Sequence, residues 1–289
     1  MRAGPLYSPR MDANRAPLRI GWFATGQGTG SRTLLAAAFN AIRRGELAAT
    51  IPFLFCNREP GEHPNSDLLL AMAAGFDIPV VMLSDRRFRR RAGGAIVRAG
   101  EPLPAWRLEY DHAVLEAVAP YHTDIGMLAG YMLIFGPEAC ARYTFLNLHP
   151  AAPGGPIGTW QRVIWHLIEQ RAPESGVLIN RVIPAVDEGP VIAFCRYSLR
   201  TPAFLPLWRA LGEMTADQLQ EQDGETAPLF AAIRAAGVAR EQPLMVQTLV
   251  ALAQGRLCIK DGLPYVDGVL VSGGLDLTAE VEDAIRRSS

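Results

Sequence analysis

Apolar runs separated by helical patterns constrain the fold of this chain more than any other feature of its sequence. Each run has the length of a buried strand, and they occupy residues 18–25, 50–56, 79–83, 124–130 and 144–149. Helical patterns lie between them, in a helix that opens after residue 32 and at residues 66–75, 110–119 and 137–142. Such alternation is typical of a parallel sheet covered by helices on both faces. We therefore predict an α/β, Rossmann-like fold with a mostly parallel sheet.

The chain is long enough for one complete domain and an addition to it. It has 289 residues, and its character changes after Leu199, where prolines and a Gln/Glu-rich stretch begin. A helix at residues 243–253 and a small hairpin formed by residues 256–260 and 263–266 are predicted beyond that point. We predict a disordered tail at residues 1–17, a catalytic domain at residues 18–200 and a C-terminal extension at residues 201–289.

Charge and composition limit the partners. The formal charge of −1, from 28 basic and 29 acidic residues, gives no footprint for a nucleic acid or an anionic membrane surface. We expect small-molecule ligands, and a homodimer stays open. The basic run at residues 86–91 is interpreted as a solvated loop. No segment approaches the ~18 uninterrupted apolar residues of a membrane span, and the first 17 residues contain no signal-peptide core, so we expect a cytoplasmic protein.

The cysteines and histidines show no metal-binding spacing. The four cysteines lie far apart, mostly in apolar runs, and are predicted to be buried thiols in a reducing compartment. They are Cys56, Cys140, Cys195 and Cys258. The histidines also lack the spacing of metal ligands, so no metal site is predicted.

Two polar side chains mark the end of the strand at residues 144–149. Strand alternation places Asn147 and His149 on one face and the neighbouring leucines on the other. Pro150 cannot continue a central strand, so both groups lie at its carboxyl end, where ligands bind in open α/β sheets. Taken alone, the pair is equally compatible with side chains that tie down a loop.

A carboxylate farther along the chain completes a recognisable pattern. Asp187 lies in a turn just before an apolar strand, in Asp187-Glu188-Gly189-Pro190-Val191-Ile192. Together with Asn147-Leu148-His149-Pro150, this segment resembles the folate-dependent formyltransferases, most closely the glycinamide ribonucleotide type. The resemblance covers roughly residues 18–200 and includes Gly158 and the run Leu128-Ala129-Gly130-Tyr131-Met132.

The resemblance implies a cosubstrate and further site residues. The cosubstrate is 10-formyltetrahydrofolate. The residues implied to contact folate are Tyr131, Met132, Leu133, Ile134 and Val186, and Glu241 is implied, more weakly, to approach the acceptor's ribose.

The chemistry of formyl transfer explains the three residue types. When an amine attacks the formyl carbon, the carbonyl oxygen becomes negative, and preorganised donors stabilise it. We assign Asn147 as the amide donor and His149 as a second donor that also takes part in proton transfer. The amine must lose a proton and the folate nitrogen must gain one, and Asp187 is the candidate acid–base group. A simple turn residue is the alternative for Asp187.

The Gly-rich segment of residues 26–32 opens a helix directly after the first strand. Its backbone N–H groups and the helix dipole suit a phosphate, and the family holds the substrate's phosphate there. It matches neither the P-loop nor the dinucleotide fingerprint, and a mere tight turn stays open. The predicted phosphate-binding residues are Gly28, Thr29, Gly30, Ser31 and Arg32.

The chain departs from the family at several positions. Ser175-Gly176 stands where a His-Gly or Thr-Gly pair is usual, Leu133 where an Arg is common, and Ala151 where a Ser is common. The loop at residues 151–158 is about two residues short. Each change can reshape a pocket, but none touches Asn147, His149 or Asp187.

The expected function is formyl transfer from 10-formyltetrahydrofolate to the amino group of a phosphorylated glycinamide ribonucleotide, a step of purine biosynthesis. A formyltetrahydrofolate hydrolase and a formyltransferase acting on another amine are alternatives on the same scaffold. A more distant alternative is a Rossmann-type NAD-dependent oxidoreductase, although the second strand ends at Asn57 and not at the acidic residue that such a protein needs. A non-catalytic folate- or nucleotide-binding regulator is a further class.

Overall fold

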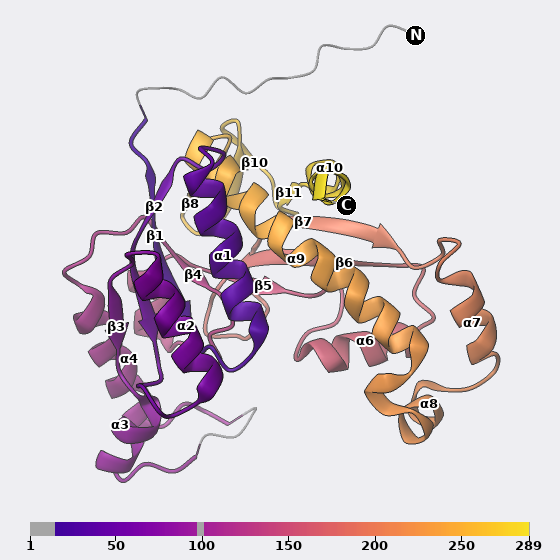
Figure 1. Ribbon diagram of the computed structural model, residues 1–289, viewed down its shortest axis with the longest axis horizontal. Helices are drawn as coiled ribbons and strands as arrows, with labels where there is room; N and C mark the ends of the chain where they lie inside the picture. Colours follow the sequence, from indigo (N-terminus) through magenta and orange to yellow (C-terminus); the bar gives the residue numbers. More distant parts are fainter. Residues whose placement is uncertain (1–14, 97–100, 289) are drawn as a thin grey trace, which may run out of the picture.

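The computed structural model describes residues 15–96 and 101–288 (Figure 1). Of the tail predicted to be disordered, residues 1–14 lie outside the described residues. The described part forms an α/β structure in which helices cover a twisted sheet.

The central sheet has eight strands in the described residues, in the order β11-β7-β6-β5-β4-β1-β2-β3. Strands β5 and β6 and strands β6 and β7 pair antiparallel, and every other neighbouring pair is parallel. The prediction of a mostly parallel α/β sheet is therefore confirmed. The strands are β1 (Leu18–Ala24), β2 (Ala49–Cys56), β3 (Val80–Met82), β4 (Ile125–Leu128), β5 (Phe145–His149), β6 (Glu174–Arg181), β7 (Val191–Ser198) and β11 (Leu275–Asp276).

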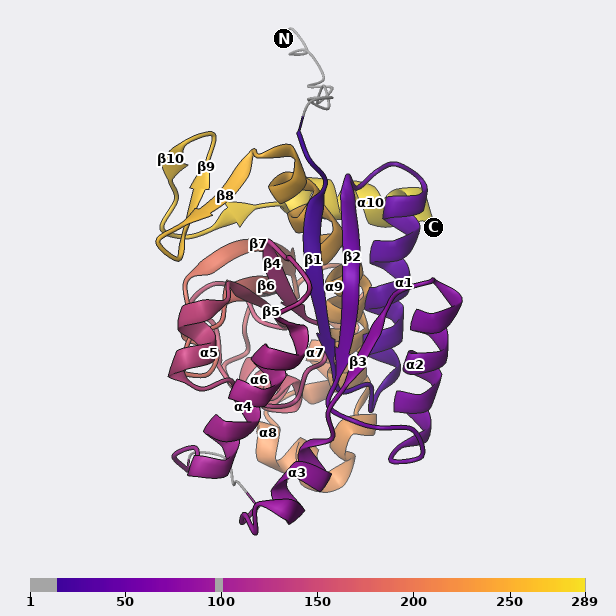
Figure 2. The ribbon, with the colours of Figure 1, turned by 90° about the vertical axis from the view of Figure 1, so that its left-hand side faces the viewer.

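Helices lie on both sides of this sheet. Figure 2 shows α1 and α2 on one side of β1 and β2, with α4 and α5 on the other. The helices that precede β7 are α1 (Thr29–Arg43), α2 (Pro64–Gly75), α3 (Asp85–Arg91), α4 (Ala105–Val118), α5 (Pro137–Arg142) and α6 (Trp160–Glu169). Those that follow β7 are α7 (Leu205–Leu211), α8 (Ala216–Gln222), α9 (Pro228–Gln254) and α10 (Thr278–Ser288), with a short 3₁₀ helix at Gly224–Thr226.

Strand alternation divides the core into two layers. Trp22 of β1 packs with α1 and α9 in an aliphatic layer, whereas its neighbour Phe23 packs with Phe53, Phe135 and other rings in an aromatic layer beneath α4 and α5. Both faces of the strands are thus buried, which explains their nearly continuous apolar sequences. A third apolar cluster joins α6, α7, α8 and the start of α9.

Two local predictions were wrong. Residues 85–91 form the helix α3 and not a loop, because the side chain of Ser84 accepts a hydrogen bond from Arg87 N and caps the helix. Helix α9 begins at Pro228 and runs through Pro243, where we placed its start. The Ala-rich sequence before Pro243 favours helix, and packing against α1 and β6 supports the continuous element.

The residues after position 200 join the central core as well as extending it. Helix α9 packs on β6 and α1, and β11 pairs with β7. The predicted hairpin around Asp261-Gly262 is present, as β8 (Leu257–Lys260) and β9 (Leu263–Val266), and β10 (Val269–Leu270) adds a third strand. In Figure 2 this small sheet stands at the end of the molecule where β1 begins.

Two further predictions can be compared with the structure. Three of the four cysteines are buried free thiols as predicted, whereas Cys258 is half-buried. Among the described residues, no helix combines the length and apolar character that a membrane crossing requires.

Candidate active site

Asn147, His149 and Asp187 come together at the carboxyl end of β5. Asn147 Nδ2 lies 3.4 Å from Asp187 Oδ1, and His149 Nδ1 lies 3.6 Å from Asp187 Oδ2. The imidazole is buried and the Asp187 carboxylate nearly so, with side-chain exposures of 5% and 11%. An amide donor, an imidazole and a carboxylate therefore share one partly enclosed space.

Asp187 reaches this space from the turn between β6 and β7. Its φ of 59° is in the left-handed region, which Asp tolerates better than most residues, and Gly158 N donates to its Oδ2 over 3.3 Å. Gly189 lets the turn close, because a Cβ there would lie 1.7 Å from Arg181 O. The backbone of the turn thus aims the carboxylate at β5.

His149 is oriented by the loop that follows β5. Its Nε2 lies 2.9 Å from Pro156 O. Because a carbonyl oxygen only accepts hydrogen bonds, we assign the ring proton to Nε2, which leaves Nδ1 facing Asp187. Ala152 of this loop lies against Gly176, where a Cβ would come within 2.9 Å of Ala152 Cα. The glycine next to Ser175 therefore lets the loop lie close to β6.

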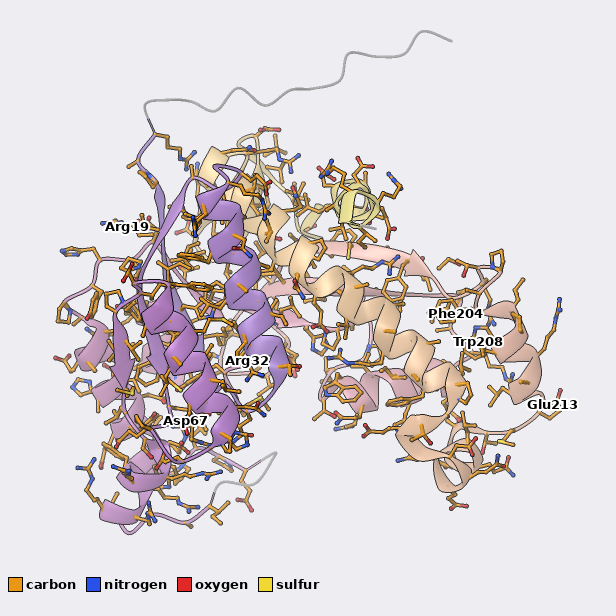
Figure 3. The ribbon with its side chains drawn as sticks, viewed as in Figure 1. Arg19, Arg32, Asp67, Phe204, Trp208 and Glu213 are labelled. Carbon is orange, nitrogen blue, oxygen red and sulfur yellow. The ribbon has the colours of Figure 1, made fainter. Side chains whose placement is uncertain are left out.

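The predicted phosphate loop forms the N-terminus of α1. Gly28 is its N-cap and no side chain caps the first turn, which also contains no acidic residue. Arg32, near this end of α1 in Figure 3, donates through Nη1 to Asn65 O (3.1 Å) and Asn65 Oδ1 (3.0 Å). Asn65 Nδ2 donates in turn to Gln27 O (2.8 Å). The open helix end is thus braced by the start of α2.

The predicted folate-contacting residues differ in exposure. Met132, Ile134 and Val186 are 67%, 39% and 46% exposed, and exposed apolar patches often mark ligand-binding surfaces. Leu133 is half-buried. The ring of Tyr131 is buried in the aromatic layer and stacks on Phe135 with a 5.0 Å centroid separation. Three of the five side chains therefore offer apolar surface, and Tyr131 supports the segment from within.

These three groups of residues adjoin one another. Thr25 N, at the end of β1, donates to Gly130 O (3.1 Å), and a Cβ on Gly130 would lie 2.4 Å from Ser31 Oγ. On the other side, Leu128 is in register with Asn147. The phosphate loop, the folate segment and the catalytic cluster therefore occupy the carboxyl ends of the neighbouring strands β1, β4 and β5, where α/β sheets bind ligands.

Glu241 lies on α9. Its Oε1 pairs with Arg234 Nη1 at 2.7 Å, and Arg234 Cζ lies 4.6 Å from the ring centroid of Trp160, the first residue of α6. Arg234 was not singled out from the sequence, because its contact with Trp160 joins two elements that lie far apart in the chain. Within residues 15–96 and 101–288, no group of three or more His, Cys, Asp or Glu side chains is arranged to hold a metal ion.

Comparison with known proteins identifies the family of the chain. Residues 19–198 match the model of a family described as formyl transferase. The chain is 25% identical over 256 residues to phosphoribosylglycinamide formyltransferase of Haemophilus influenzae. The matched region covers 86% of this chain and 94% of that protein. It is 27% identical over 130 residues to formyltetrahydrofolate deformylase of Escherichia coli, covering 44% of this chain and 40% of that protein.

Solved structures show the same fold. Phosphoribosylglycinamide formyltransferase from Coxiella burnetii superposes with a TM-score of 0.63 and 21% identity, covering 90% of this chain and 99% of that one. Formyltetrahydrofolate deformylase from Burkholderia mallei superposes with a TM-score of 0.56 and 17% identity, covering 87% and 70%. Because the family match extends over most of the central sheet, including β5, this chain belongs to the formyl transferase family.

Proposed function

We propose that this protein transfers the formyl group of 10-formyltetrahydrofolate to a primary amine, and that the amine belongs to a phosphorylated glycinamide ribonucleotide. The observation that carries the proposal is the contact of Asn147, His149 and Asp187 at the end of β5. Similarity to proteins named phosphoribosylglycinamide formyltransferase supports the acceptor.

The cluster contains the groups that addition to the formyl carbon needs. As the amine nitrogen bonds to that carbon, the carbonyl oxygen becomes an oxyanion. Asn147 Nδ2 donates to it, and His149 Nδ1 is the second donor while it carries the proton that it shares with Asp187. Removal of one such donor typically lowers the rate by about 10²–10³. The donors are already fixed by β5 and by Pro156 O, so they need little rearrangement.

The second half of the reaction requires proton movement. The bond from the formyl carbon to the folate nitrogen breaks, this nitrogen gains a proton, and the amine nitrogen loses one. The Asp187 carboxylate takes the proton from the amine and returns it to the leaving nitrogen, directly or through a water. Its contact with His149 Nδ1 lets the two groups share that proton.

Apolar surface and the open end of α1 support the two ligands. Met132, Ile134 and Val186 present exposed apolar side chains on which a pteridine ring can lie. The uncapped N-terminus of α1, with Ser31 and Arg32 in its first turn, suits the acceptor's phosphate. Both features adjoin the catalytic cluster through Gly130 and Leu128.

Hydrolysis of the same donor is the second candidate, because the chain also matches formyltetrahydrofolate deformylases. Water would then replace the amine, and formate would leave. The oxidoreductase alternative receives no support: Asn57 at the end of β2 is fully buried and donates to Asp85 Oδ1 (3.2 Å).

The test incubates the purified protein with 10-formyltetrahydrofolate in three arms, with glycinamide ribonucleotide, with other amines, and with no acceptor. Tetrahydrofolate and formate are measured in each. We expect tetrahydrofolate to form only with the ribonucleotide, and without formate. Formate release in every arm would replace the transferase by the hydrolase. Turnover with another amine alone would change the acceptor, and absence of folate binding would overturn the proposal.

A further inference from the structure

The segment from residue 131 to residue 136 has no helix or strand, yet side chains fix its backbone at every second residue. The backbone N–H groups at both ends and one carbonyl between them are each bonded to a buried side chain from another element. The three contacts join Met132 N to Thr25 Oγ1 (2.9 Å), Arg107 Nη2 to Ile134 O (2.7 Å) and Gly136 N to Asp111 Oδ2 (2.7 Å).

The three side chains are buried and mutually supported. Thr25, Arg107 and Asp111 are 0%, 2% and 4% exposed. Arg107 and Asp111 lie one turn apart on α4 and form an ion pair of 3.2 Å between Nη2 and Oδ1. The Arg107 guanidinium also lies 5.5 Å and 5.3 Å from the ring centroids of Trp106 and Tyr110. Its position is therefore fixed before any ligand binds.

A buried ion pair is a poor device for stability alone. Removing two charges from water costs about as much as their attraction returns, so well-packed apolar residues often serve as well. Here each member of the pair also bonds a backbone group of the same irregular segment. The arrangement therefore specifies one shape for residues 131–136.

That shape exposes the apolar side chains that we assign to folate binding. With the backbone held from inside at residues 132, 134 and 136, Met132 and Ile134 project outward while Phe135 is fully buried. We propose that Thr25, Arg107 and Asp111 are positioning residues that hold this segment in the form that receives the reduced folate. The inference rests on the proposed function, since it takes that segment as the folate site.

Positioning residues have a distinct kinetic effect. None of the three is placed against Asn147, His149 or Asp187, so they act through the segment and not on the reacting atoms. A segment that is ordered in advance binds its ligand without the cost of ordering it. Loss of one hydrogen bond should weaken folate binding by about 5- to 20-fold, with a smaller change in kcat at saturating folate.

Two substitutions at one position give the sharpest test. Thr25→Val keeps the shape of the side chain and removes the oxygen that accepts from Met132 N, whereas Thr25→Ser keeps that oxygen. Calorimetry gives the Kd of tetrahydrofolate, the product of the proposed reaction. We expect Thr25→Val to raise this Kd by about 5- to 20-fold and Thr25→Ser to stay near the wild type.

Asp111→Asn provides a second variant, and Asp124→Asn is its matched control. Asp124 also accepts a hydrogen bond from a backbone N–H, that of Arg19, and pairs with the side chain of the same arginine (2.8 Å each). This pair lies where β1 and β4 begin, at the opposite end of the strands from the proposed site. We expect Asp111→Asn to weaken tetrahydrofolate binding and to speed amide exchange of residues 131–136, and Asp124→Asn to change neither.

The outcomes separate this inference from the proposed function. If the wild type binds no tetrahydrofolate, both fail. If the wild type binds it and Thr25→Val and Asp111→Asn bind it equally well, only the positioning role fails. Weaker binding in Thr25→Ser as well as Thr25→Val would also count against it, because the acceptor oxygen would then be irrelevant.

Discussion

His149 Nδ1 lies 3.6 Å from Asp187 Oδ2, although all of α6 and β6 separates the two residues along the chain. The ring's other nitrogen faces Pro156 O, which can only accept. A proton added to the ring therefore lies between the imidazole and the carboxylate. The pair is thus arranged to hold one proton close to the amide of Asn147.

Replacement of Asp187 by Asn should remove this proton acceptor without changing the size of the side chain. We expect kcat for formyl transfer to fall by about 10²–10⁴, with the Kd of tetrahydrofolate within about twofold of the wild type. Glu188→Gln is the control, since Glu188 is an exposed carboxylate in the same turn. Equal loss in both variants would mean that the turn and not the carboxylate matters.

Asn147 and Asp187 should act as a unit. Their side chains lie 3.4 Å apart, so loss of one changes what the other can do. We expect Asn147→Ala to lower kcat by about 10²–10³. The fold-decrease in kcat of the double variant Asn147→Ala/Asp187→Asn should be well below the product of the two single fold-decreases. Single-turnover rates of the four proteins complete the cycle. Strictly multiplicative losses would show that the residues act independently.

The sequence predicted those parts of the fold and site that follow from local patterns. Alternation on β5 put Asn147 and His149 on one face, and the apolar runs corresponded to the parallel strands. The two antiparallel pairings of β6, with β5 and β7, could not be predicted from local patterns, because the direction of a strand depends on the path of the loops. The contacts of Thr25, Arg107 and Asp111 with residues 131–136 join segments far apart in the chain, and no spacing rule indicates them.

Gly130 should be required at the junction of the phosphate loop and the folate segment. Its φ is 73°, and a Cβ there would lie 2.4 Å from Ser31 Oγ. We expect Gly130→Ala to lower the free energy of unfolding by about 1–3 kcal/mol, from left-handed strain and the clash together. Ser31→Ala added to Gly130→Ala should restore only the part due to the clash. Denaturant unfolding of the wild type, Gly130→Ala and the double variant measures both parts. If the double variant is no more stable than Gly130→Ala, the contact with Ser31 is contradicted.

Arg32 should matter for the acceptor and not for folate. Its guanidinium is held by Asn65 O and Oδ1 beside the open end of α1. We expect Arg32→Ala to raise the KM for glycinamide ribonucleotide by about tenfold, in line with the loss of a hydrogen bond to a charged group, and to leave the KM for the folate unchanged. Arg44→Ala, at the other end of α1, is the control. A change confined to the folate KM would reverse our assignment of the two ligands.

Because of Asp111, folate affinity should rise with pH while the stability contributed by this group falls. Burial raises the pKa of Asp111 to about 6, against the attraction of Arg107. In the unfolded chain the pKa of an Asp is about 4, so between pH 4 and 6 the folded chain binds more protons than the unfolded chain. The stability that this group contributes therefore falls as pH rises through that window and is constant above it.

Binding should follow the charged form, because only the carboxylate pairs with Arg107 while accepting from Gly136 N. We expect the Kd of tetrahydrofolate to rise as pH falls through about 6 in the wild type and to be weak and independent of pH in Asp111→Asn. His112 of α4 and Glu138 of α5 line the same small cavity as Asp111, so the test must separate their charges from that of Asp111. His112→Gln should therefore keep the wild-type midpoint of the pH dependence of the Kd of tetrahydrofolate. If the midpoint disappears in His112→Gln and persists in Asp111→Asn, the histidine is responsible and the carboxylate is not.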